Sequence, residues 1–282
     1  MKTKDQLIDQ LLELAFAEDV GDGDHTTLST IPADAKGKSQ LLIKQKGILS
    51  GVEVAKKVLA KVDPSLKMEV LIEDGAQVKP GDVAFIVEGS VRSLLIAERT
   101  MLNIMQRMSG VATMTHEYQK RLEGLHTKVL DTRKTTPGMR MLEKEAVKTG
   151  GGENHRIGLF DMILIKDNHI DFAGGLEKAI KAAQDYCSKE GKNLKIEVEV
   201  RSLDDIRKVL EIGGVDRIMF DNFTPELTKE AVKLVDGRCE TESSGGITME
   251  TLRDYAEAGV DFISVGALTH SVKGLDMSFK AI

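Results

Sequence analysis

The 282-residue sequence has only two cysteines, and it lacks both a long apolar run and a basic tail. Cys187 and Cys239 stand in separate segments without the spacing of metal ligands, which predicts free thiols in a reducing compartment. No apolar run approaches the roughly 18 residues that a bilayer span requires, so we expect no membrane-spanning segment. The formal net charge is −6 and no basic patch is interleaved with aromatics, which argues against nucleic-acid binding.

The first twenty residues carry charges among their apolar positions, which predicts an amphipathic helix and not a signal peptide. The helix is expected to end at the glycine and aspartate cluster GDGDHTT. Its apolar face should be formed by Leu7, Ile8, Leu11, Leu12, Leu14 and Ala15. With no targeting signal, the expected location is the cytoplasm.

The rest of the N-terminal part alternates between strand and helix patterns. Residues 38–49 predict a short pair of strands, residues 51–62 a helix, and residues 68–89 alternating strands around a Gly- and Pro-containing turn. Residues 92–123 predict one long helix or two helices that break at Ser109–Gly110. Arg99 lies in an otherwise apolar stretch of this segment, and both a structural pairing with Glu98 and a functional role remain open.

From residue 127 onward, β-rich apolar runs alternate with helical patterns. This rhythm indicates a parallel sheet, and its period indicates a βα barrel. Six strands are visible where a complete barrel has eight, so we expect an incomplete barrel whose open side is covered by the N-terminal domain or a partner subunit. The final residues GLDMSFKAI alternate like a strand that returns to the N-terminal sheet. The predicted barrel strands are 128–131, 162–165, 195–200, 217–221, 240–244 and 262–266.

Chemically capable residues stand where these strands end, which is where active sites of βα barrels lie. The positions are Arg133, Lys134, Lys166, Glu199, Asp221, Ser244 and Gly266. Arg133, Lys134, His155, Arg156 and Lys166 form a group of cations that opposes the negative charge of the whole chain. Solvated surface charge would explain one such lysine, but five cations at strand ends indicate an anion-binding active site.

The strand KIEVEV places Glu197 and Glu199 on the face opposite Ile196 and Val198. The apolar face suits surrounding helices, so both carboxylates should point into the barrel, with Lys166 as their expected partner. An internal ion-pair network is the alternative interpretation. Carboxylates beside cations, with Asp221 as a third acid, suggest a substrate that is partly anionic and partly becoming positive. A ribosyl oxocarbenium-like centre flanked by phosphates fits that description.

Glycine-rich loops follow the two last barrel strands. Ser243, Ser244, Gly245 and Gly246 follow one strand, and Gly266 follows the next. In βα barrels these loops often form a phosphate cradle, because glycine lets backbone N–H groups approach an oxyanion. Structural glycines in αβ loops are the alternative.

Several segments together carry a family resemblance: EDVGDGDHTT, ERTMLN, DTRKTTPGMR, GGGENHRIGLFDMILIKDNH, EVEV, MFDNF, ESSGGI and VGALTHS. Through nearly its whole length the chain resembles the quinolinate phosphoribosyltransferase family (nicotinate-nucleotide pyrophosphorylase, carboxylating). Molybdenum-transport-associated homologues share much of the pattern. The resemblance implies an N-terminal α/β sandwich domain over residues 1–110, with 274–282 as a candidate return strand. It also implies an incomplete, six- or seven-stranded TIM-like βα barrel over residues 111–273, in an obligate homodimer or a higher oligomer.

The resemblance implies transfer of the phosphoribosyl group of PRPP to quinolinate, giving nicotinate mononucleotide, pyrophosphate and CO₂ in NAD biosynthesis. Lys134, Lys166, Glu199 and Asp221 would then be catalytic, with both lysines on phosphates and both acids on ribose hydroxyls and Mg²⁺. Quinolinate would be held by Arg133, His155 and Arg156, together with Arg99 from the neighbouring subunit. Other substrate-binding positions would be Thr132, Ser244, Gly245, Gly246, Ser264, Val265 and Gly266.

Other functions remain open on the residues alone. One is a lyase that uses Lys166 as a Schiff-base nucleophile. Another is a phosphoribosyltransferase-like homologue of the molybdenum-associated kind, or a non-catalytic sensor of phosphorylated metabolites. If the protein is a phosphoribosyltransferase, nicotinate is an alternative acceptor to quinolinate.

Overall fold

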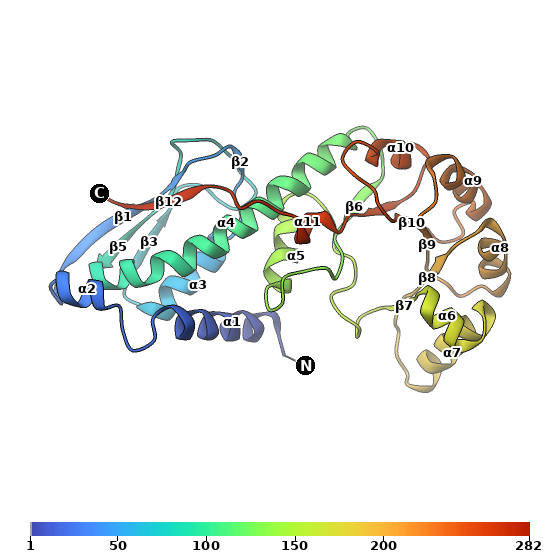
Figure 1. The fold of residues 1–282 in the computed structure, drawn as a ribbon, viewed down its shortest axis with the longest axis horizontal. Helices are drawn as coiled ribbons and strands as arrows, with labels where there is room; N and C mark the ends of the chain where they lie inside the picture. Colours follow the sequence, from blue (N-terminus) through green and yellow to red (C-terminus); the bar gives the residue numbers. More distant parts are fainter. Residues whose placement is uncertain (1) are drawn as a thin grey trace. The chain divides into compact units, whose positions relative to one another are not determined.

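A four-stranded antiparallel sheet and a six-stranded parallel sheet organise the chain (Figure 1). The computed structural model describes residues 2–282. One unit contains the residues up to His116, residues 134–151 and residues 267–282, and the other contains residues 117–133 and 152–266. Residues 111–116, 134–151 and 267–273, which we predicted as part of the barrel domain, are thus grouped with the N-terminal residues.

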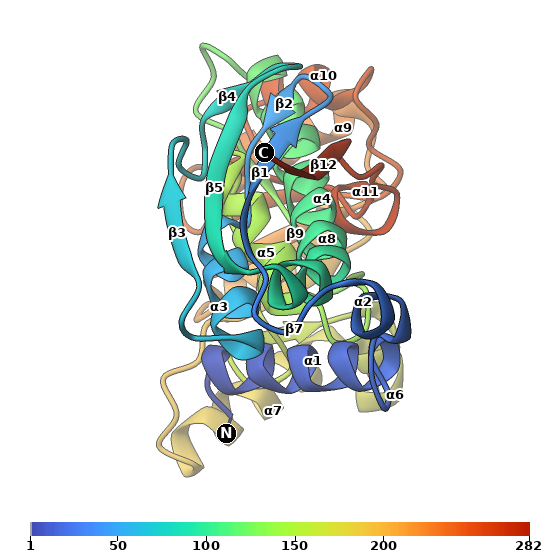
Figure 2. The ribbon, with the colours of Figure 1, turned by 90° about the vertical axis from the view of Figure 1, so that its left-hand side faces the viewer.

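The antiparallel sheet of the first unit has the order β12–β1–β5–β3. Its strands are β1 (Lys36–Ile43), β3 (Lys67–Val70), β5 (Val83–Ser90) and β12 (Met277–Ala281). The C-terminal β12 pairs antiparallel with β1, with Leu41 opposite Phe279. Burial alternates along β1, because one face of the sheet packs against α3 (Val52–Val62) and α4 (Val91–Arg121) (Figure 2).

The strand pair predicted over residues 38–49 was wrong in its pairing. Two strands do form there, β1 and the short β2 (Gly47–Ile48), but they do not pair with each other. β1 joins the four-stranded sheet, whereas β2 pairs antiparallel with β4 (Gln77–Val78). The pairing differs because partners distant in the sequence take up the hydrogen bonds of both strands.

Helix α4 runs unbroken through Ser109–Gly110, so the possible break there is absent. A Cβ atom on Gly110 would lie 2.2 Å from the carbonyl oxygen of Lys273, so this glycine allows the C-terminal segment to approach the helix closely. The neighbouring Ser109 hydroxyl donates to the carbonyl of Ser50 at 3.0 Å. Both residues therefore serve the packing of the helix against other segments of the first unit.

The N-terminal helix α1 (Lys4–Asp19) begins at a capping box between Thr3 and Gln6. Ile8 and Leu12 are buried on it, but Leu14 is 65% exposed. The prediction that Leu14 belongs to the apolar face was wrong, because a residue two positions from Leu12 points in another direction on a helix. After the Gly–Asp cluster a second short helix, α2 (His25–Thr30), begins with Asp24 as its N-cap.

All six predicted barrel strands are present in the second unit, and the prediction of an incomplete barrel is confirmed. They are β6 (Lys128–Leu130), β7 (Ile163–Ile165), β8 (Ile196–Val200), β9 (Arg217–Asp221), β10 (Glu240–Ser244) and β11 (Phe262–Ser264). The order is β6–β11–β10–β9–β8–β7, and every pairing is parallel. A single bridge between Leu130 and Glu153 adds a further strand-like segment beside β6.

Helices connect the strands of this sheet, as in a βα barrel (Figure 1). They are α6 (Asp167–Ala173), α7 (Leu176–Lys189), α8 (Leu203–Ile212), α9 (Pro225–Val235) and α10 (Leu252–Glu257). Two other helices, α5 (Arg140–Thr149) and α11 (Ala267–His270), belong to the first unit. Within residues 2–282, no helix combines the length and the apolar character needed to cross a bilayer.

Candidate active site

The carboxyl edge of the parallel sheet carries most of the predicted site residues. Lys166 directly follows β7, Asp221 ends β9, and Ser244 ends β10. Because all six strands run parallel, their carboxyl ends lie at one edge of the sheet. The topology therefore gathers there residues that lie far apart in the sequence.

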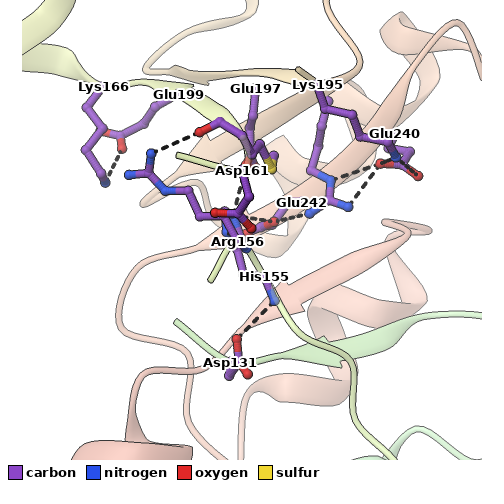
Figure 3. Close-up of polar contacts among 12 residues, drawn as sticks. Asp131, His155, Arg156, Asp161, Lys166, Lys195, Glu197, Glu199, Glu240 and Glu242 are labelled. Carbon is purple, nitrogen blue, oxygen red and sulfur yellow. Dashed lines mark hydrogen bonds and ion pairs between the residues drawn. The ribbon is translucent and has the colours of Figure 1, made fainter. Parts of the chain in front are cut away.

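Lys166, Glu199 and Asp221 form one cluster at this edge. The Nζ atom of Lys166 lies 3.0 Å from Oε2 of Glu199, as expected from the sequence (Figure 3). Burial raises the pKa of Asp221, and the neighbouring Glu199 carboxylate raises it further, while the Asn222 amide and Lys166 oppose the rise. Two close carboxylates with hard oxygen donors suit Mg²⁺, which is commonly held by one or two carboxylates together with substrate phosphates. The two acids thus fit the Mg²⁺ that the family resemblance implies.

Arg133 and Arg156 form a pair of neighbouring cations. Burial lowers the pKa of Arg156, and the positive charge of Arg133 lowers it further, against the opposing effect of Glu197 and Asp161. The Nη1 atom of Arg156 donates to the carbonyl of Met162 at 3.4 Å. An anion that binds both groups would offset their mutual repulsion, and guanidinium groups bind carboxylates with paired hydrogen bonds.

His155 is buried, with its backbone bonded to Asp131 and its imidazole ring facing Glu197 in the barrel interior. Its backbone N–H donates to Oδ1 of the buried Asp131 at 3.0 Å (Figure 3). Its Nδ1 accepts from the backbone N–H of Arg156 at 2.7 Å, and its Nε2 lies 2.8 Å from Oε2 of Glu197. These contacts fix the orientation of the imidazole ring and the position of the Arg156 backbone N–H.

Glu197 and Glu199 both point into the barrel, but they have different partners. Glu199 pairs with Lys166 at the edge, as predicted. Glu197 lies deeper, is fully buried, and has His155 as its close basic neighbour. The expectation that Lys166 is the partner of both carboxylates was wrong for Glu197. For that residue, the internal ion-pair network is the correct interpretation.

Two members of this network, Glu242 and Arg217, were missed in the sequence. Nη1 of Arg217 donates to Oε2 of the fully buried Glu242 at 3.0 Å, and Nη2 donates to Glu240 at 3.0 Å. Burial raises the pKa of Glu197 to about 7. Burial together with the Glu197 carboxylate raises the pKa of Glu242 to about 8. The alternation of acidic residues in ETESS, which matches that in KIEVEV, was the available signal for Glu242.

His155, Glu197 and Glu242 also bring three potential metal-ligand atoms within 4.8 Å of one another. However, Oε2 of Glu242 already accepts from Arg217 and lies 3.5 Å from Nε2 of His155. Two basic side chains thus face two carboxylates, which offsets the buried charge without a metal ion. We therefore assign this cluster to the ion-pair network of the barrel interior.

The two glycine-rich loops lie side by side, because they follow the paired strands β10 and β11. A Cβ atom on Gly245 would lie 2.2 Å from Oδ1 of Asn222, so this glycine is required by packing. Gly246 has a φ of +62° and no atom within 4 Å of its Cβ position, which leaves room beside its backbone. Of these two glycines, Gly246 therefore fits the predicted phosphate cradle better. Val265, in the second loop, donates its N–H to the carbonyl of Leu130 at 2.9 Å.

Two predicted site residues belong to the first unit. Arg99 is exposed on α4, and among the described residues it forms no ion pair with Glu98 or another acid. Lys134 is exposed in the loop between β6 and α5. Thr132, half-buried at the end of β6, belongs to the second unit.

Comparisons with known proteins agree on one family. Its C-terminal domain, described as quinolinate phosphoribosyl transferase, C-terminal domain, matches residues 111–280, and its N-terminal domain matches residues 24–109. The chain is 44% identical over 286 residues to a mitochondrial quinolinate phosphoribosyltransferase (decarboxylating) 2 of Nicotiana glauca, covering 96% of this chain and 81% of that protein. It is 42% identical to a probable nicotinate-nucleotide pyrophosphorylase (carboxylating) of Bacillus subtilis, covering 95% and 91%.

Solved structures give the same result. The NadC structure from Streptococcus pyogenes superposes with a TM-score of 0.92 at 39% identity, covering 100% of this chain and 99% of that one. The nicotinate-nucleotide pyrophosphorylase from Francisella tularensis also gives 0.92 at 39% identity, covering 100% and 98%. At this identity and coverage, the likeness extends to both units of the chain.

Proposed function

The chain belongs to the quinolinate phosphoribosyl transferase family, and from this membership we propose that it transfers the phosphoribosyl group of PRPP to the ring nitrogen of quinolinate. Carbon dioxide and pyrophosphate leave, and nicotinate mononucleotide is the product, which supplies NAD biosynthesis. The single observation that carries the proposal is the Lys166–Glu199–Asp221 cluster at the carboxyl edge of the parallel sheet.

The pyridine dicarboxylate is bound by the cationic side of the site. Arg133 and Arg156 supply two neighbouring guanidinium groups, and each can pair with a carboxylate through two hydrogen bonds. His155 is held beside them through its contact with Glu197. Arg99, exposed on α4, is assigned to the site of a second subunit, which makes the protein a homodimer or a higher oligomer with shared active sites.

PRPP is bound by the lysines and the glycine-rich loops. Lys134 and Lys166 contact its phosphate groups, and Thr132, two residues after β6, contributes a hydroxyl group. The backbone N–H groups of residues 244–246 and 264–266 surround the 5′-phosphate. This assignment is supported by the pairing of β10 with β11, which places both loops at the same edge.

Glu199 and Asp221 bind the ribose hydroxyls and would hold Mg²⁺. When bound, Mg²⁺ neutralises charge on the pyrophosphate leaving group. In this assignment their negative charge stabilises the positive charge that develops at the anomeric carbon.

The chain's residues act by position and charge, and no covalent intermediate is formed with the protein. The arginine pair holds the acceptor so that its ring nitrogen faces the anomeric carbon. Lys166 and Lys134 stabilise negative charge that accumulates on the departing pyrophosphate. After transfer, the ring nitrogen is cationic, and the electrons left by departing CO₂ are stabilised by that charge and by the nearby guanidinium groups.

A cytoplasmic location is part of the proposal. The names of plant relatives include mitochondrial and chloroplastic proteins, so subcellular fractionation with a specific antibody is the direct measurement.

The activity test is to mix the purified protein with PRPP, Mg²⁺ and quinolinate and to follow quinolinate loss and nicotinate mononucleotide formation. Consumption of quinolinate in preference to equimolar nicotinate supports the proposal. Binding of PRPP without turnover would indicate a sensor. Borohydride trapping of substrate on Lys166 would indicate a lyase.

A further inference from the structure

The loop that carries Lys134 has no regular secondary structure of its own. It joins β6 to α5 across residues 131–139, and Lys134 and Thr136 are both exposed in it. An exposed lysine on such a loop keeps a defined position only if the loop backbone is fixed by contacts from elsewhere. The loop therefore needs an anchor before Lys134 can bind phosphate with defined geometry.

The first anchor is the carboxylate of Glu143 on α5, which is fully buried. One oxygen, Oε2, accepts the backbone N–H of Thr136 at 3.0 Å. The other, Oε1, accepts Nε of Arg107 from α4 at 3.0 Å and lies 2.9 Å from its Nη2 atom. The carboxylate thus connects the loop backbone on one side to a guanidinium group on the other.

The second anchor passes through Thr269 on α11. Its hydroxyl donates to the carbonyl oxygen of Lys134 at 2.8 Å. The carbonyl of Thr269 accepts from Nη2 of Arg107, and Nη1 of Arg107 donates to the carbonyl of Val272 at 3.4 Å. Nη2 of Arg107 also donates directly to the Thr136 hydroxyl at 3.4 Å. Arg107 is therefore connected to Thr136 both directly and through Glu143, and to Lys134 through Thr269.

We propose that Arg107 and Glu143 are positioning residues that fix the Lys134 loop for binding the phosphate groups of PRPP. The inference rests on the proposed function, in which Lys134 contacts those phosphates. Arg107 is suited to this role because its planar fork of donors reaches Glu143, Thr269 and Val272 at once. Lysine at this position would keep the positive charge but could not donate to three acceptors in the same plane.

The experiment compares Arg107→Lys and Glu143→Gln with Arg92→Lys as the matched control. Arg92 is also on α4 and also donates to backbone carbonyl groups, through Nε to Ile31 at 2.9 Å, but it does not contact the loop. For Arg107→Lys and Glu143→Gln we expect kcat/KM for PRPP to fall by roughly 10- to 100-fold, mostly through KM, with a smaller change in KM for quinolinate, because the anchored residues Lys134 and Thr136 follow Arg133 in the loop. The Arg92→Lys protein should keep wild-type constants.

Amide hydrogen exchange of residues 134–139 supplies a readout that does not depend on catalysis. The Thr136 amide should exchange at least about tenfold faster in Arg107→Lys and Glu143→Gln than in wild type, and Arg92→Lys should match wild type. Unchanged exchange in both variants, or equal changes in KM for the two substrates, would overturn the inference. If wild type consumes no quinolinate, the proposed function fails, and the assignment to PRPP fails with it. The exchange rates then decide separately whether the pair holds the loop.

Discussion

Nε2 of His155 lies 2.8 Å from Oε2 of Glu197, and their side chains are only 6% and 0% exposed. Glu242 and Arg217 extend this contact across the barrel interior, where Glu242 meets both His155 and Arg217. His155, a predicted substrate-binding residue, is thus in contact with buried ionisable side chains. Burying so many charges is favourable only if each is paired, so the network should respond strongly to the loss of one member.

The substitution Arg217→Met removes the cation that pairs with Glu242 and Glu240. We expect the free energy of unfolding to fall by about 1–3 kcal/mol, because the buried Glu242 carboxyl loses its hydrogen-bond donor whether or not it carries a proton. Urea unfolding followed by circular dichroism measures the change. Lys195→Met is the control, since Lys195 meets the same Glu240 only at 3.4 Å and at the surface. The control should change stability by less than about 1 kcal/mol, and an equal loss in both variants would contradict the prediction.

Stability should depend on pH through Glu242. Its pKa is raised from 4.5 to about 8 in the fold, by burial first and then by the Glu197 carboxylate. Between these values the folded protein holds a proton that the unfolded chain has released. The contribution of Glu242 is therefore fully present below about pH 4.5 and is lost as the pH rises through about 8.

The measurement for this prediction is urea unfolding at roughly pH 5, 6.5 and 8. Glu242→Gln should lose part of the wild-type decline in stability across this range, because glutamine cannot release the proton. Glu257→Gln, which removes an exposed carboxylate paired with Arg253, should keep the wild-type decline. If the Glu242→Gln protein follows the wild-type curve, Glu242 does not titrate in this range.

The barrel and its edge could be predicted because their signals are local in the sequence. Each strand is a short β-rich run, and a parallel sheet brings the residues at the ends of its strands together. Lys166 and Asp221 were therefore found from strand position alone, and the Lys166–Glu199 pair followed from alternation along KIEVEV.

The buried network could not be predicted in the same way, because it depends on the register between strands. Arg217 meets its acids because β9 and β10 pair with Arg217 opposite Glu240. No local pattern encodes that offset. Gly110 was interpreted as a helix break for a similar reason, since the segment that needs its missing side chain lies far along the chain at Lys273.

The substitution Gly110→Ala should destabilise the protein, although alanine is the better helix former. In an exposed helix the change would stabilise by about 1 kcal/mol. Here the new methyl group would lie 2.2 Å from the Lys273 carbonyl oxygen, so we expect a loss of about 1–3 kcal/mol in urea unfolding. Gly274→Ala is the control, because its nearest atom would lie 3.5 Å away at Gln106. A stability gain in Gly110→Ala would show that the C-terminal segment does not approach the helix this closely.

The shared active site predicts that two inactive proteins complement each other. Arg99→Ala and Lys166→Ala should each lose activity, since each removes a cation from every site of a homodimer. In a heterodimer, one site lacks both cations and the other has both, so random pairing should restore about a quarter of wild-type activity. Co-expression with two affinity tags followed by the quinolinate assay measures this. Lys166→Ala with Glu199→Ala is the matched control, because these side chains meet at 3.0 Å within one chain and every site then lacks one of them. Rescue in the control, or none in the test pair, would contradict a site completed by Arg99 of a second subunit.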